Sequence, residues 1–167
     1  MTRVLAILLT LASLTTVQAQ TSSVTSGALS IDRPWARASP SGATLTAGYL
    51  VIHNRGSEVD RLVSGATDAA SDIQIHMMTV DRGVIRMRQL VDGLEIPAHS
   101  DVVLAPGGAH LMFAGLRRPL KKGDLVKADL LFERAGSIAV VFDVKSVGAT
   151  SPNTPSKPGD AMDGMKM

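Results

Sequence analysis

The residues best suited to chemistry are histidines and methionines at regular spacing. His110 and Met112 flank Leu111 in a short apolar run, residues 109–113, which follows the glycine-rich turn 106–108. Turn residues on both sides of this run predict a strand, and alternate side chains of a strand share one face. An imidazole and a thioether would then lie side by side, and both are ligands for a soft metal ion.

A second pair, His76 and Met87, lies upstream on two apolar runs that the turn 81–83 connects. This arrangement predicts a hairpin whose register depends on the loop length. A two-residue loop would put Met78 opposite Met87. A three-residue loop would instead put His76 opposite Arg88 and diagonal to Met87. The spacing alone leaves open whether Met78 or Met87 faces the metal.

Two imidazoles and two thioethers form a donor set that suits copper. Cu(I) prefers soft ligands, whereas Zn(II) more often takes thiolates, carboxylates or three histidines and Ca(II) takes clustered carboxylates. We therefore expect Cu(I) as the bound ion, with Cu(II) left open. Of the other two histidines, His53 at a strand end and His99 in a loop are expected to be structural or to face solvent.

The rest of the chain predicts the strands that position these residues. Short apolar runs alternate with turns rich in glycine, proline, asparagine and aspartate, a pattern typical of an all-β sandwich or barrel. The runs cover residues 29–32, 35–38, 46–52, 61–63, 73–78, 84–89, 102–104, 109–113, 127–132 and 138–144. Met77 alternates away from His76 and is expected to pack in the core, as is Trp35.

The N-terminus has the layout of a secretory signal peptide. Arg3 precedes an apolar run, residues 4–14, and a small-x-Ala pattern ends at Ala19. The run is too short and too interrupted for a good membrane span. We expect an exported protein in which residues 1–19 are the signal peptide, 20–27 a flexible lead-in and 28–147 the single folded domain.

Residues 148–167 differ sharply in composition from the domain. The segment is rich in serine, proline and glycine and has too little apolar surface to offset its ordering entropy, so it predicts a disordered tail. Three methionines, Met162, Met165 and Met167, lie near its end. They are candidates for a secondary copper site, whose oxidation state the sequence leaves open.

Composition and charge exclude several functions. Seventeen Lys and Arg against fifteen Asp and Glu give a net charge of +2 without any basic stripe or acidic block, so we expect no nucleic acid or membrane surface as partner. The chain has no cysteine, which excludes disulfides, a thiolate metal site and a lipidated N-terminal cysteine. We expect a monomer that is not embedded in a membrane.

The four candidate ligands also fit a known family motif. In this motif a histidine is followed after ten residues by a methionine and, after about twenty-one more, by His-x-Met. Ten residues separate His76 from Met87 here, and twenty-two separate Met87 from His110; loops around 92–93 or 98–100 can absorb the extra one. With the stretches 34–38, 47–50, 60–62, 96–98 and 106–112, the sequence resembles the periplasmic copper chaperone family PCu(A)C over roughly residues 28–147.

The resemblance implies a cupredoxin-like Greek-key β-sandwich or barrel that binds Cu(I) near its surface. It implies His76, Met87, His110 and Met112 as the ligands. It further implies delivery of copper to the dinuclear CuA centre of cytochrome c oxidase, with a Sco-type thiol protein as a cooperating partner.

Other functions remain as alternatives. A copper storage or resistance protein would use similar ligands, and a metal-free β-sandwich that binds peptide or sugar would merely pack its His and Met side chains. An electron-transfer cupredoxin would need a cysteine ligand, which the chain lacks. An enzyme is not expected, since no nucleophile motif frames the Ser, His and Asp residues.

Overall fold

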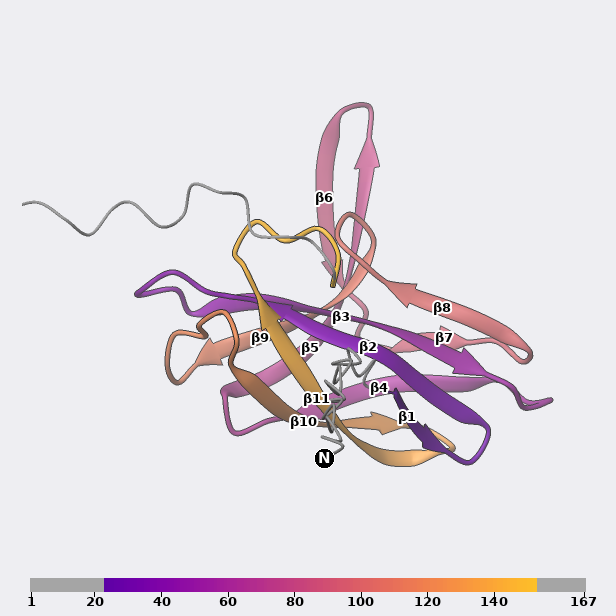
Figure 1. The fold of residues 1–167 in the computed structure, drawn as a ribbon. Helices are drawn as coiled ribbons and strands as arrows, with labels where there is room; N and C mark the ends of the chain where they lie inside the picture. The colour runs from indigo at the N-terminus through magenta and orange to yellow at the C-terminus, as the bar shows by residue number, and fades with distance from the viewer. Residues whose placement is uncertain (1–22, 153–167) are drawn as a thin grey trace, which may run out of the picture.

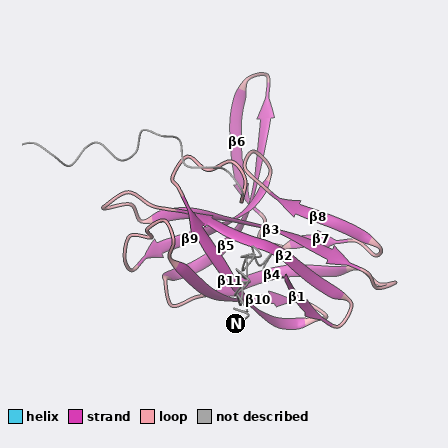
Figure 2. Cartoon of the chain, viewed as in Figure 1, coloured by secondary structure: helices cyan, strands magenta, loops and turns pink. Residues whose placement is uncertain are grey.

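The computed structural model describes residues 23–152, which form strands, turns and loops without any helix (Figure 2). The eleven strands are β1 (Ser23–Ser26), β2 (Leu29–Arg37), β3 (Leu45–Asn54), β4 (Asp60–Ala66), β5 (Ala70–Asp81), β6 (Val84–Gln89), β7 (Leu94–Ile96), β8 (Ser100–Leu104), β9 (Ala109–Leu116), β10 (Leu125–Phe132) and β11 (Gly136–Lys145). Over this part of the chain, no helix is long and apolar enough to cross a membrane.

Seven of these strands close into a barrel. The hydrogen-bonded order β2-β11-β10-β4-β5-β9-β3 returns to β2 because β3 also pairs with β2. The pairing of β11 with β2 is parallel, and every other pairing in the ring is antiparallel. The remaining strands β1, β6, β7 and β8 extend β2, β5, β4 and β3. The molecule is an all-β, cupredoxin-like barrel, so the predicted fold class is confirmed (Figure 1).

The core follows from the two-residue period of the strands. Along β10 every second side chain is buried, from Val126 to Phe132, while the residues between them face solvent. Phe113 on β9 and Phe142 on β11 meet edge to face inside the barrel, with ring centroids 5.3 Å apart. Isoleucine, leucine and valine fill most of the remaining interior, as the low aromatic content predicts.

The structure corrects three expectations about the elements. Residues 23–26 form β1 instead of belonging to a flexible lead-in. The runs 29–32 and 35–38 belong largely to one strand, β2, whose register shifts around Arg33 at a φ of 50°. The tail does not leave the domain at residue 148, because Ala149 is fully buried against Trp35 and Tyr49. The predicted signal peptide and the three tail methionines lie outside the described residues.

Candidate metal centre

The centre of the site is a direct pairing of two histidines. Strands β5 and β9 run antiparallel in a register that places His76 opposite His110. Their neighbours Ile75 and Leu111 point into the core and are buried, so the two imidazoles share the other face of the sheet. The ring centroids are 5.8 Å apart, with the planes inclined at 65°.

The hairpin between β5 and β6 settles the register that the sequence left open. Arg82 and Gly83 form a two-residue loop with φ of 49° and 80°, and positive φ at both positions is the signature of a type I′ turn. Met78 consequently lies directly opposite Met87. The hairpin projects away from the barrel (Figure 1), and Met87, on its outer strand, is 47% exposed.

Met112 completes the set of predicted residues on this face. It pairs with Gln74 of β5 on one side and with Ala47 of β3 on the other, two positions beyond His110. Met77 points the opposite way and packs against the core, as predicted. One face of β9, β5 and β6 therefore carries His110, Met112, His76, Met78 and Met87.

Hydrogen bonds orient the ring of His110. Its Nδ1 atom donates to the carbonyl oxygen of Gly108 at 3.0 Å, which leaves the Nε2 lone pair of the neutral ring available. The same carbonyl accepts the backbone N–H of Met78 at 3.1 Å. The turn before β9 thus fixes the imidazole of His110 and the start of the hairpin together, and His110 is only 3% exposed.

His76 is held by a short relay that the sequence did not reveal. Its Nε2 atom donates to Oε1 of Gln74 at 3.0 Å, and the Gln74 amide donates in turn to Asp72 at 3.0 Å. The carboxylate accepts only, so it fixes which end of the amide faces His76. The only sequence signal for this relay is that all three residues lie at alternate positions of one strand.

This arrangement leaves Nδ1 of His76 buried and without a hydrogen-bond partner among residues 23–152. A buried polar atom without a partner costs free energy, and such atoms in folded proteins usually have a functional reason. Burial lowers the pKa of His76 below its ordinary value, and the charge that His110 can carry lowers it further. A histidine that stays neutral keeps its lone pair for a metal ion.

An apolar wall borders the histidines on the β3 side. Tyr49 lies with its ring centroid 6.3 Å from that of His110, and Trp35 stacks behind it at 4.4 Å. Arg37 sits over the Tyr49 ring at 5.6 Å and donates from Nε to the carbonyl of Ala149. Burial raises the pKa of Tyr49, which the charge of Arg37 partly opposes. Trp35, whose distance from the metal the sequence left open, lies behind Tyr49 in this wall.

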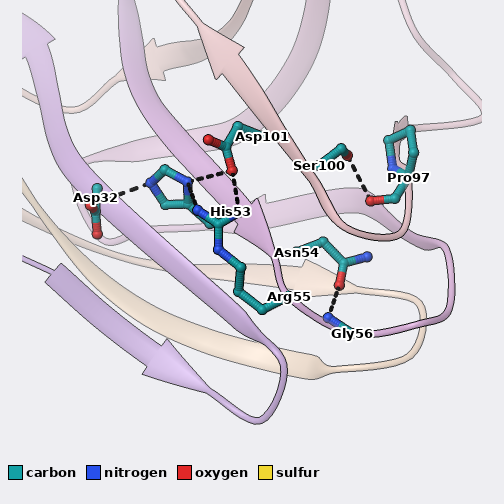
Figure 3. Close-up of polar contacts among 8 residues, drawn as sticks. All are labelled: Asp32, His53, Asn54, Arg55, Gly56, Pro97, Ser100 and Asp101. Carbon is teal, nitrogen blue, oxygen red and sulfur yellow. Dashed lines mark hydrogen bonds and ion pairs between the residues drawn. The ribbon is translucent and has the colours of Figure 1, made fainter.

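The other two histidines lie elsewhere. Figure 3 shows His53 near the end of β3 between two carboxylates, with Nδ1 at 2.7 Å from Asp101 and Nε2 at 3.3 Å from Asp32. Arg55 pairs with the same Asp101 at 3.0 Å. His99 is exposed in a loop with a φ of 52°. His53 makes structural contacts and His99 faces solvent, as expected.

Solved structures with the same fold include copper-bound ones. The copper-bound PCuAC domain from PmoF2 is 25% identical to this chain, with a TM-score of 0.65 over 75% of this chain and 98% of that one. The solution structure of Cu(I)-DR1885 from Deinococcus radiodurans is 26% identical, with a TM-score of 0.53 over 76% and 81% of the two chains. The fold of this chain is thus similar to that of PCuAC domains.

Sequence relatives point the same way. A model of the family "Putative lipoprotein LpqE-like" matches residues 29–144. The putative lipoprotein Lxx21020 from Leifsonia xyli subsp. xyli is 32% identical over 135 residues, which cover 81% of this chain and 80% of the relative. The chain belongs to the LpqE-like family, which is the PCuAC family that the histidine and methionine motif predicted.

Proposed function

We propose that the protein is a periplasmic copper chaperone that binds Cu(I) through His76, Met87, His110 and Met112 and passes it on by ligand exchange. The observation that carries this proposal is the pairing of His76 with His110, with thioethers on the same face. The copper-bound PCuAC structures of similar fold support it.

The donor atoms fit the ion. Each imidazole has one nitrogen engaged by a protein oxygen and the other without a protein hydrogen bond among the described residues, Nδ1 in His76 and Nε2 in His110. Neutral imidazoles and thioethers hold Cu(I) as soft donors, but cysteine thiolates bind it more tightly. Transfer to a thiolate acceptor therefore runs downhill, and no catalytic group is needed.

We infer the acceptor from that chemistry. The CuA centre in the cytochrome c oxidase subunit is the proposed destination, with a Sco-type thiol protein as cooperating partner. Periplasmic location rests on the predicted signal peptide. The chain has no cysteine.

The tail methionines remain a proposed secondary site. Residues 150–152 line a small hollow together with Ala105 and Pro106, in the turn that leads to Gly108 and His110. Pro152, the last described residue, therefore lies near the turn that precedes His110. Met162 is ten residues further on, and an extended segment of that length spans up to about 35 Å.

An anaerobic Cu(I) competition titration tests the proposal. Wild type is compared with the H110A/M112A double variant, and thermal unfolding confirms that both are folded. We expect one tight equivalent in wild type that the double variant loses, followed by transfer from wild type to an apo CuA domain. Equal binding by both proteins would refute the site. Tight binding without transfer would favour copper storage, and wild-type protein that binds no copper would favour a metal-free binding module.

A further inference from the structure

The strand register shows a symmetry that the linear motif conceals. Both β5 and β9 carry a His-x-Met triplet: residues 76–78 on β5 and residues 110–112 on β9. The strands are antiparallel and the histidines are exact partners, so the two triplets are related by an approximate two-fold axis through the His76–His110 pair. Met78 therefore has the same relation to this pair that Met112 has.

The pairing of β5 with β9 gives the position of each methionine relative to the two histidines. Met112 lies opposite Gln74, so it is the diagonal neighbour of His76 across the ladder. Met78 donates its N–H to the Gly108 carbonyl, so it is the diagonal neighbour of His110. Diagonal neighbours in an antiparallel pair are about 7–8 Å apart at Cα, which long side chains can bridge. Each methionine is thus next to one histidine along its own strand and diagonal to the other.

Met87 is placed differently. It is diagonal to His76 only, because β6 pairs with β5 and not with β9. Two strand spacings, about 9–10 Å, separate its strand from that of His110. Met87 is also more exposed than Met78, which is partly buried.

The side chain of Met78 does not pack against the hydrophobic core of the described part of the chain. The partly buried side chains that pack against the core include Met77 but not Met78. Met78 instead lies between the exposed Met87 and the histidine pair, on the same face as both.

We propose that Met78 is a further copper ligand, so that two antiparallel His-x-Met triplets hold the ion together with Met87. This inference rests on the proposed function and adds a third thioether to the ligands named there.

The test compares four conservative variants: M78L, M77L, M87L and M112L. Leucine keeps the apolar volume and removes only the sulfur, and M77L is the matched control because its side chain is one position away on the opposite face. Each protein is titrated anaerobically with Cu(I) against a chromophoric chelator. X-ray absorption of the loaded protein counts sulfur neighbours of the copper, and thermal unfolding checks each fold.

We expect M78L and M112L to weaken Cu(I) binding alike, by about tenfold or more, and each to lose one sulfur neighbour. M77L should bind as wild type, whereas M87L removes a ligand of the proposed function and should also lose affinity. If M78L binds like wild type and M77L, with an unchanged sulfur count, the inference is wrong while the proposed function stands. If wild type itself binds no Cu(I), both fail.

Discussion

His76 and His110 are direct cross-strand partners, yet separate carbonyl oxygens orient their rings. Gln74 Oε1 accepts from His76 and the Gly108 carbonyl accepts from His110. The two nitrogens that remain are therefore set in place by the apo fold before any metal arrives. Such preorganisation reduces the entropic cost of binding.

Replacement of either histidine of this pair should weaken Cu(I) binding strongly. H76A and H110A each remove a ligand. Removal of a group that only supports a ligand lowers metal affinity about 10–100-fold, so each of these variants should lose more Cu(I) affinity than that. Competition titration measures the loss. H53A and H99A are the matched controls, since His53 is engaged by carboxylates and His99 is exposed in a loop. A comparable loss in either control would contradict the assignment.

Gln74 should act as a positioning residue for His76. Q74A removes the oxygen that accepts from Nε2, so the imidazole is no longer fixed in one tautomer, and Cu(I) affinity should fall about tenfold. Q74E keeps an acceptor but sets its carboxylate against that of Asp72, so it should restore only part of the affinity. Nitrogen-15 NMR of the apo protein should show a change of His76 tautomer in Q74A. Q89A, opposite His76 on β6, is the control, and an unaltered tautomer in Q74A would contradict this role.

Acid should weaken copper binding, but at lower pH than an ordinary histidine would dictate. Burial and the charge of His110 lower the pKa of His76 from its usual value near 6.5. Because the pKa of His76 is lower in the folded protein, the unfolded chain takes up a proton first as the pH falls. The neutral imidazole of His76 therefore favours the folded state above about pH 6.5, and this contribution to folding stability is lost as the pH falls through the lowered pKa. Proton NMR of the apo protein should show His76 titrating below the ordinary histidine value. In H110Q its pKa should move upward, because one of the two causes is removed.

Much of this architecture could be predicted from the sequence. Alternation in residues 109–113 correctly separated His110 and Met112 from the core-facing Leu111, because the period of a strand is two and does not depend on its partners. The pairing of β5 with β9 could not be derived in this way. Their residues are distant in the chain, and a one-residue slip would have turned every side chain to the other face.

The register of the β5–β6 hairpin and the relay from His76 to Asp72 also could not be predicted from the sequence. Both loop lengths were compatible with residues 81–83, and only the positive φ of Arg82, uncommon for a residue other than glycine, gives the two-residue turn. Gln74 and Asp72 belong to no recognisable motif. Their role in fixing the tautomer of His76 becomes visible only from the hydrogen bonds of the folded structure. Ala149 was assigned to a tail by composition, although a single small residue suffices to cover Trp35 and Tyr49.

Gly48 should be intolerant of even a methyl group. It lies on β3 opposite Leu111, and a Cβ built there would lie 2.4 Å from the ring of Phe113, which itself packs on Phe142. G48A should lower the free energy of unfolding by about 1–3 kcal/mol, as expected for overpacking of a core. Thermal or denaturant unfolding measures the loss. G107A is not an equivalent control because of its positive φ, whereas G108A meets only a carbonyl at 3.8 Å and should cost less. Equal stability of G48A and wild type would show that the ring can move aside.

The C-terminal segment should contribute to the fold through Ala149 and to copper through the residues beyond Pro152, and two truncations separate these roles. Deletion of residues 148–167 uncovers Trp35 and Tyr49, so it should lower the free energy of unfolding by about 2 kcal/mol and shift the emission of Trp35, the only tryptophan, to longer wavelength. Deletion of residues 153–167 leaves Ala149 in place and should unfold as wild type does.

Only the shorter deletion tests the tail methionines, because the longer one also disturbs the wall beside His110. If Met162, Met165 and Met167 capture copper, the 153–167 deletion should bind less copper in total while keeping the tight equivalent at the histidines. A triple variant with leucine at the three positions should behave in the same way. Unchanged stoichiometry and transfer in both proteins would show that the tail has no part in copper handling.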